Sequence, residues 1–165
     1  MNLGKTKVVI FRRGGRIGKR DHFFVNGAEI EVVKSYVYLG VVFSSSGLFC
    51  EETESRIKKT LGAQMSTLNI IMRNKIVNPD SINSIFDSMV QSVLLYGAAV
   101  WSLRYLDKIE RVQQSFYKRF LNLPRSTPGY FVRLETGRPH TRVKLVVPLL
   151  KLWVKLMRSP RGSLL

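Results

Sequence analysis

The acidic side chains that most often carry enzyme chemistry are few and scattered in this chain of 165 residues. Phosphoryl or nucleotidyl transfer by two metal ions requires carboxylates clustered around both ions. The four aspartates are instead spread along the chain, where helix capping or solvation explains each of them: Asp21, Asp80, Asp87 and Asp107. The sequence therefore predicts no complete active site.

The remaining candidate nucleophile and metal ligands are isolated. His22 and His140 lack the ligand spacing of a zinc site, and a Cys50 nucleophile would need a base that the sequence does not offer. With one cysteine the chain forms no internal disulfide, which fits a reducing compartment. The start of the chain shows no apolar signal region, and no charge-free apolar run reaches the roughly 18 residues of a spanning helix. We expect no bound cofactor, no membrane contact, and an intracellular location in the nucleus or cytoplasm.

Basic residues dominate, with a formal net charge of +16, and they are unevenly placed. Residues 1–20 hold seven Lys or Arg and no acid, residues 125–165 hold nine and one acid, and residues 21–124 are nearly balanced at eleven against ten. Charge gathered in this way is typical of proteins that bind polyanions, and nucleic acid is the favoured polyanion. Arg12 and Arg13 are predicted contacts in the first basic segment. A basic surface without a dedicated ligand remains the alternative.

Short apolar runs and turn signals predict a small sheet in the first third of the chain. Val8 to Phe11 is predicted as a short strand, and Phe23–Val25 and Glu29–Val33 as a hairpin across Asn26-Gly27, the strongest short hairpin signal. The charge-free stretch from Tyr36 to Phe43 has two interpretations. A buried strand kinked at Gly40 is favoured on these residues alone, and a loop tip that positions a polymer end is the alternative.

After about Glu51 the period of apolar residues changes to that of helices. A first helix is predicted to end near Asn74, a second to start at Asn78-Pro79, and a third to run from about Asp107 to Asn122. The first has an apolar stripe formed by Ile57, Leu61, Met65, Leu68 and Met72. The third sets basic side chains off its apolar face: Arg111, Lys118 and Arg119.

The last part of the chain is predicted to be helical as well. A short helix begins at Ser126-Thr127-Pro128 and ends at Gly137, and residues 142–158 form a basic amphipathic helix with a kink or start at Pro148. Packing on the core is the default role of that helix, with a membrane surface or a partner as alternatives. We expect an α+β fold: a small antiparallel sheet in residues 1–48, a helical bundle in 49–123, helices in 124–158 and a disordered tail in 159–165.

Several sequence segments, in order along nearly the whole chain, resemble the end of the reverse transcriptase of non-LTR (LINE-type) retrotransposons. They are Asn2-Leu3-Gly4-Lys5-Thr6-Lys7, Val25-Asn26-Gly27, Tyr38-Leu39-Gly40-Val41, Leu94-Leu95-Tyr96-Gly97, Leu123-Pro124-Arg125-Ser126-Thr127-Pro128 and Leu134-Glu135-Thr136-Gly137-Arg138. Each segment alone is a weak signal, and their order and spacing make the match specific.

The resemblance implies a palm remnant with motifs D and E, a three-helix thumb and a connector. Lys5 and Lys7 would lie near the incoming nucleotide or its pyrophosphate, and the primer grip formed by Tyr38, Leu39 and Gly40 near the primer terminus. The helix with basic residues Arg56, Lys58 and Lys59 would lie beside the minor groove of the template-primer.

The family's Asp-Asp metal motif, which uses Mg²⁺, precedes the matched region. We therefore expect this chain alone to lack polymerase activity and to bind RNA and RNA/DNA template-primer beside the upstream part of the polymerase. A stand-alone basic RNA-binding or adaptor protein is the alternative, and a decayed element without a selected role is a third possibility.

Overall fold

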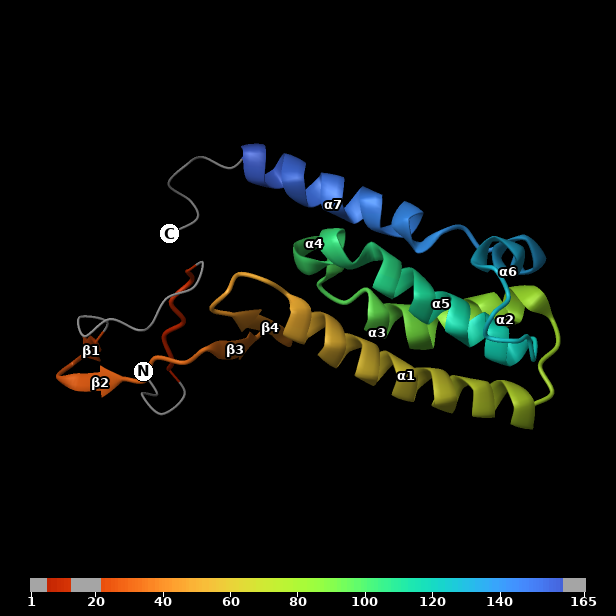
Figure 1. The fold of residues 1–165 in the computed structure, drawn as a ribbon, viewed down its shortest axis with the longest axis horizontal. Helices are drawn as coiled ribbons and strands as arrows, with labels where there is room; N and C mark the ends of the chain where they lie inside the picture. Colours follow the sequence, from red (N-terminus) through yellow and green to blue (C-terminus); the bar gives the residue numbers. More distant parts are fainter. Residues whose placement is uncertain (1–5, 13–21, 159–165) are drawn as a thin grey trace. The chain divides into compact units, whose positions relative to one another are not determined.

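The computed structural model describes residues 6–12 and 22–158, and the chain divides into two compact units, Met1–Glu54 and Ser55–Leu165. Antiparallel strand pairs belong to the first unit and helices fill the second, so the fold is α+β and mainly helical, as predicted (Figure 1). No helix in these two described ranges has the length and apolarity needed to cross a membrane. The predicted tail, residues 159–165, lies outside the described residues.

The first hairpin pairs β1 (Phe23–Val25) with β2 (Ala28–Ile30) and confirms the prediction from its turn. Asn26 and Gly27 take φ values of 50° and 78°, which is the combination that a two-residue hairpin turn requires. The predicted strand from Val8 is reduced to one parallel bridge between Val8 and Val32. Two backbone hydrogen bonds form this bridge, from the Val8 nitrogen to the Glu31 carbonyl at 3.0 Å and from the Val33 nitrogen to the Val8 carbonyl at 2.9 Å.

The stretch from Tyr36 to Phe43 is not a single kinked strand, so the favoured interpretation is wrong. It is a hairpin of β3 (Ser35–Tyr38) and β4 (Val41–Ser44), with Tyr38 paired to Val41. Leu39 and Gly40 form the turn with φ values of 47° and 78°. The glycine marks a reversal of the chain because both turn positions need positive φ.

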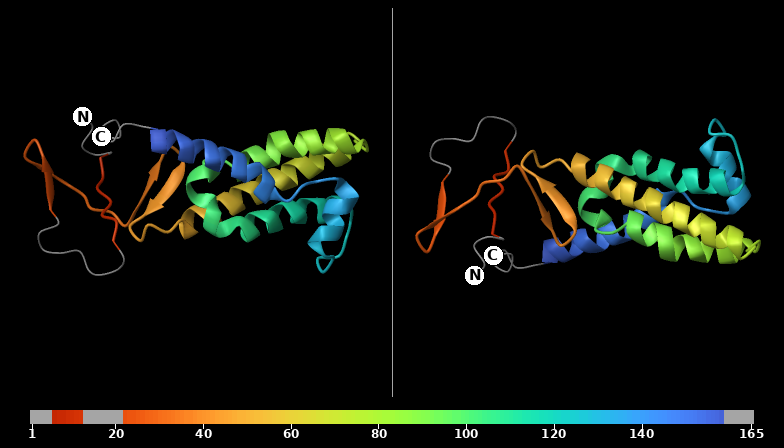
Figure 2. Two further views of the ribbon diagram at one scale, coloured as in Figure 1. Left: turned by 90° about the horizontal axis from the view of Figure 1, so that it is seen from above. Right: turned by 90° about the horizontal axis from the view of Figure 1, so that it is seen from below.

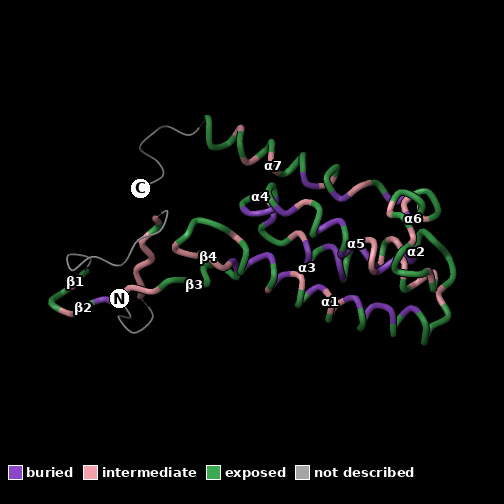
Figure 3. The backbone as a smooth tube through the Cα atoms, viewed as in Figure 1, coloured by how far each residue is buried: buried purple, intermediate pink, exposed green. Residues whose placement is uncertain are grey.

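Helix α1 (Cys50–Arg73) buries a mainly polar face that overlaps only part of the predicted apolar stripe. Thr60, Gln64 and Thr67 are fully buried, whereas Met65 is 51% exposed and Met72 is 59% exposed. Figure 3 shows the buried residues of α1 recurring along one side of the helix. Leu68 of the predicted stripe is 5% exposed, and Ile57 and Leu61 are half-buried, so the stripe is confirmed in part. The rest was misplaced because the sequence does not show which face of a helix meets its neighbour.

These buried polar groups are satisfied locally or by α5 (Leu106–Phe120), which lies beside α1 (Figure 2). The Thr60 hydroxyl donates to the Arg56 carbonyl at 2.8 Å. The Gln64 amide nitrogen donates to the Val112 carbonyl at 2.7 Å, and Ser115 donates to the Gln64 oxygen at 3.2 Å. A polar seam between two helices is stable only when its groups are paired in this way.

The second predicted helix begins as expected and then changes its winding. The Asn78 side chain accepts from the backbone nitrogens of the first turn of α2 (Pro79–Ile85), which confirms the predicted cap. A π-helical segment, Phe86–Gln91, follows and leads into α3 (Ser92–Leu94). Gly97, with φ of 63°, then turns the chain into α4 (Ala98–Trp101) and a 3₁₀ turn, Ser102–Tyr105.

The core lies where α1, α2, the π-helical segment, α5 and α6 (Gly129–Thr136) meet. Its centre is an aromatic cluster in which the Phe86 ring lies 4.7 Å from that of Phe116 and 5.1 Å from that of Tyr117. Aliphatic residues surround it: Leu68, Ile71, Ile82, Val90 and Val132. The last helix, α7 (Thr141–Arg158), runs through Pro148 and packs on α4 and α5.

Candidate nucleic-acid interface

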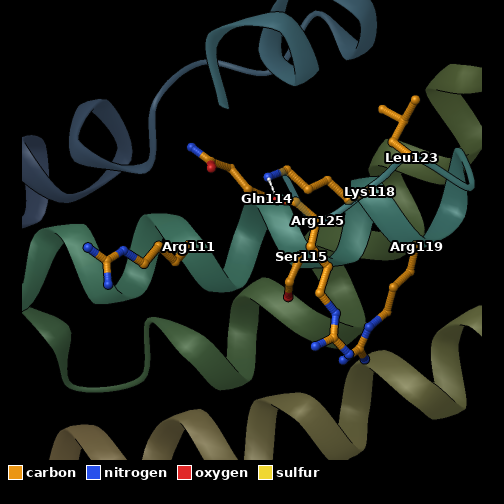
Figure 4. Close-up of a pocket in the computed structure, with 7 residues that line it drawn as sticks. All are labelled: Arg111, Gln114, Ser115, Lys118, Arg119, Leu123 and Arg125. Atoms are coloured by element: carbon orange, nitrogen blue, oxygen red, sulfur yellow. Dashed lines mark hydrogen bonds between the residues drawn. The ribbon is translucent and has the colours of Figure 1, made fainter. Parts of the chain in front are cut away.

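A basic hollow of about 250 Å³ lies over the second half of α5. It is lined by Arg111, Gln114, Ser115, Lys118, Arg119, Leu123 and Arg125 (Figure 4). Four of these seven side chains are cationic, and among the described residues no Asp or Glu lines the hollow. An anion such as a backbone phosphate would therefore meet several donors there without a competing carboxylate.

Two of the cations are directed at one place. Figure 4 shows the Arg119 and Arg125 side chains extending in the same direction, toward α1, and both line the hollow. Arg119 also reaches α1, where its Nη1 lies 3.4 Å from the Met65 sulfur. Because like charges held together repel, the arrangement favours a bound anion between or beside them.

A helix-ending turn brings Arg125 back over α5. Asn122 takes a φ of 52°, and the Leu123 nitrogen donates to the Lys118 carbonyl at 2.7 Å, which is a Schellman-type end. Lys118 Nζ then donates to the Arg125 carbonyl at 2.9 Å. The sequence Asn-Leu-Pro-Arg thus positions its arginine beside basic residues that precede it on the helix.

The second candidate surface is the tip of the β3–β4 hairpin. Tyr38 is 59% exposed and Leu39 is 74% exposed, and the Tyr38 ring packs edge-on to Phe43 at 6.5 Å. Leucine at positive φ costs about 1–2 kcal/mol. An exposed, strained aliphatic residue at a loop tip is often kept for a contact with a ligand. This geometry fits the alternative interpretation, a tip that positions a polymer end.

The other predicted contacts in the first unit are placed as follows. Lys7 forms an ion pair with Glu31, and the Arg12 nitrogen donates to the Ser45 carbonyl at 2.9 Å, with the arginine half-buried. Lys5 and Arg13 lie outside the described residues.

The predicted contacts on α1 differ among themselves. Lys58 and Lys59 are exposed. Arg56 is only 6% exposed, and its guanidinium lies 4.9 Å from the centre of the Tyr96 ring. Arg56 is therefore a packing residue inside the bundle and is not presented to a surface ligand. The helical period explains this placement, because Arg56 shares the buried face of Thr60 and Gln64.

A second charged cluster fastens the end of the chain to the bundle. Arg138, 8% exposed, pairs with Asp87 through both Nη atoms and donates to the Gln91 oxygen at 2.8 Å. Lys144 Nζ lies 3.0 Å from Asp87 Oδ1. Burial opposes ionisation of Asp87, but the hydrogen bonds from Arg138 and Lys144 outweigh it and lower the pKa of this carboxyl.

Glu110 of α5 plays a similar role. Its carboxylate accepts from the Thr141 backbone nitrogen at 2.8 Å and from Arg133 at 3.0 Å. Burial opposes its ionisation, and the hydrogen bonds from Thr141 and Gln114 more than compensate, so that its pKa is also lowered. Both carboxylates hold the segment of α6 and α7 on the bundle.

These lowered pKa values predict acid sensitivity. The unfolded chain binds protons on Asp87 and Glu110 more readily than the folded chain, so the stabilisation is complete above about pH 4–5 and is lost as pH falls below it. We expect the free energy of unfolding, measured in urea from pH 7 to pH 3, to fall less steeply with acid for Glu110→Gln than for the wild type. Glu135→Gln, on an exposed position of α6, is the control. Equal slopes for wild type and Glu110→Gln would contradict the assignment.

Within the described residues, no group of three or more His, Cys, Asp or Glu could hold a metal ion. Comparison with protein-family models, curated proteins and solved structures found no match. The two candidate surfaces therefore rest on the chain's own residues and geometry: a basic hollow on α5 and an exposed aromatic and aliphatic hairpin tip.

Proposed function

We propose that this chain forms the end of the palm, the thumb and the connector of a LINE-type reverse transcriptase, and that it holds the template-primer duplex while another part of the polymerase extends it. The observation that carries nucleic-acid binding is the hollow on α5, which has four basic side chains and no carboxylate. The sequence segments named above, which follow one another from Asn2 to Arg138 in the same order as in that family, support this assignment. The chemical step and its metal ions belong to aspartates outside this chain.

The α5 hollow and the hairpin tip have different roles in this proposal. The hollow neutralises backbone phosphates, which gives affinity without base sequence preference. The hairpin tip, with Tyr38 and Leu39 exposed, presents aromatic and aliphatic contacts suited to a sugar or base at a strand end. A polymerase needs both functions, because it binds duplex of any sequence and must locate its 3′ terminus.

Replacing Leu39, the strained residue of the hairpin tip, tests recognition of a strand end separately from RNA binding in general. We expect Leu39→Asn to relieve backbone strain and stabilise the hairpin by about 0.5–1 kcal/mol, because Asn-Gly is the preferred turn pair. Amide hydrogen exchange of β3 and β4 should slow accordingly. The same change should weaken binding to an RNA/DNA hybrid with a recessed 3′ end by roughly fivefold, about 1 kcal/mol, while binding to a blunt hybrid is unchanged.

Val77→Asn is the matched control, since Val77 is an aliphatic residue 84% exposed outside the tip. If the wild-type chain binds the recessed hybrid, the blunt hybrid and single-stranded RNA with equal affinity, the result favours the alternative of a stand-alone RNA-binding protein. A Leu39→Asn variant that stabilises the hairpin without changing terminus preference would remove the tip from the proposal.

A further inference from the structure

Among the described residues that line the α5 hollow, Gln114 is the only amide side chain. Its Nε2 donates to Glu110 Oε1 at 2.9 Å. Glu110 also accepts from Arg133 and from the Thr141 backbone nitrogen, and its pKa is lowered, so its carboxylate is ionised and can only accept. The nitrogen of the Gln114 amide must therefore face Glu110. Of the described residues, none donates a hydrogen bond to the carbonyl oxygen of the same amide, Oε1.

The start of α6 restricts the position of this amide. A Cβ atom at Gly129 would lie 2.3 Å from Gln114 Nε2 and 2.5 Å from its Cδ and Oε1, which is closer than real Cβ contacts come. Glycine at this position therefore leaves room for the amide to pack on the α6 backbone. The bond to Glu110 and the packing on Gly129 together hold the Gln114 carbonyl in one orientation, as recognition of a single hydroxyl group requires.

Cations flank the amide on the same helix. Arg111 precedes Gln114 by three residues and Lys118 follows it by four, and this spacing makes all three neighbours on the helix surface. Figure 4 shows the Gln114 and Lys118 side chains extending from the same side of α5. Lys118 Nζ has three N–H donors and gives one of them to the Arg125 carbonyl. A nucleic-acid strand with phosphates at Arg111 and Lys118 would therefore bring the sugar between them to Gln114.

The chemistry of Gln114 Oε1 selects its partner. A phosphate cannot be that partner, because both groups only accept hydrogen bonds. In the sugar-phosphate backbone of a duplex the donor is the 2′-hydroxyl of ribose, which DNA lacks. The guanine amino group is a donor at the minor-groove edge of a base pair, but a contact to it would depend on base sequence. An acceptor placed among phosphate-binding cations is therefore complementary to an RNA strand and not to a DNA strand.

We propose that Gln114 Oε1 accepts a hydrogen bond from the ribose 2′-hydroxyl of an RNA strand whose phosphates are bound by Arg111 and Lys118. This inference rests on the proposed function and deepens it, because it states which strand of the template-primer hybrid lies in the α5 hollow. Glu110 and Gly129 are positioning residues that keep the amide in place. The chain then distinguishes RNA/DNA hybrid from DNA duplex by a hydrogen bond as well as by phosphate charge.

The probe is a hybrid of an RNA strand of adenosines with a DNA strand of thymidines, which contains no guanine amino group. A second hybrid has 2′-fluoro groups on the adenosine strand, so that it keeps the phosphates and the A-like sugar shape and lacks the hydroxyl donor. We expect the wild-type chain to bind the 2′-hydroxyl hybrid about fivefold more tightly than the 2′-fluoro hybrid, measured by fluorescence anisotropy. In Gln114→Met, which keeps the side-chain length and removes the amide, this preference should be lost.

Gly129→Ala tests the position of the amide without removing it. The added Cβ meets the far end of the flexible Gln114 side chain, which can shift, so the fold should be retained and the preference for the 2′-hydroxyl lost. Ser115→Ala is the matched control, since Ser115 also lines the hollow and its hydroxyl already donates to the Val112 carbonyl at 2.8 Å. We expect Ser115→Ala to keep the preference, and circular dichroism of all three variants checks that they fold.

Equal binding of the two hybrids by the wild-type chain would overturn this inference and leave the proposed function standing, because phosphate binding needs no 2′-hydroxyl. An unchanged preference in Gln114→Met, or a preference lost in Ser115→Ala instead, would overturn it as well. Failure of the wild-type chain to bind either hybrid would overturn the proposed function and this inference together.

Discussion

Removing the charge of Arg119 and Arg125 together, as Arg119→Gln/Arg125→Gln, is expected to lower the affinity of the chain for an RNA/DNA hybrid by about tenfold or more near physiological salt. Each arginine in contact with a phosphate releases condensed counterions, and that release is lost with the charge. Both side chains are exposed, so the fold should be retained. Fluorescence anisotropy with a labelled hybrid measures the effect.

A control must distinguish the effect of losing charge in the hollow from the effect of lowering the net charge of the chain. Arg104→Gln/Arg142→Gln removes the same two charges from exposed positions that do not line the hollow. We expect this control to change affinity by less than about threefold. Equal losses in the two double variants would mean that only the overall charge of the chain attracts nucleic acid, and that the hollow has no special role.

The largest expected effect on stability is that of Arg138→Met, about 2–3 kcal/mol. The change removes both bonds to Asp87 and the bond to Gln91, and it removes the guanidinium that lies 5.2 Å from the Phe86 ring. Lys144 still neutralises Asp87, which keeps the loss below that of a fully unpaired buried charge. Urea unfolding followed by circular dichroism measures the difference.

Arg142→Met is the control for this prediction, because Arg142 is an exposed arginine close to Arg138 in the sequence, at the start of α7. Its effect should stay within about 0.5 kcal/mol. A loss below about 1 kcal/mol for Arg138→Met would place the cluster with surface ion pairs, which contribute little. Hydrogen exchange in α6 and α7 should increase in Arg138→Met if the cluster fastens these helices to the bundle.

Local signals explain which elements could be predicted from the sequence. Asn26-Gly27, the Asn78-Pro79 cap and Gly137 at the end of α6 act through backbone geometry of one or two residues, and all three were found where expected. The turn at Leu39-Gly40 was not favoured because leucine rarely adopts positive φ and so gives no turn signal. Its strain is visible only in the folded chain.

Tertiary contacts explain the errors on α1. Thr60 and Thr67 donate to carbonyls of their own helix, so they can be buried against a neighbour without an outside partner. Gln64 finds its partners on α5, 48 residues away for the Val112 carbonyl. Apolar periodicity cannot show such pairings, and it therefore assigned Arg56 to the surface when it belongs to the buried face.

The α5 hollow was missed for a different reason. Charge was counted over residues 21–124, where acids and bases nearly cancel. In the structure Glu110 is turned inward to Arg133 and Thr141, while Lys118 and Arg119 line the hollow. Counting the charges on each face of the helix, instead of over a segment of the sequence, would have indicated a basic face on α5. The chain reversal at Asn122 adds Arg125 to that face.

The most direct test of polyanion binding by this chain is the salt dependence of its affinity for a recessed RNA/DNA hybrid. Four phosphate contacts at the hollow predict a linear fall of log affinity with log salt concentration, with a slope of about −3 to −4, and a slope smaller by about two in Arg119→Gln/Arg125→Gln. An affinity that does not change with salt, or a slope that is the same in wild type and variant, would contradict the account.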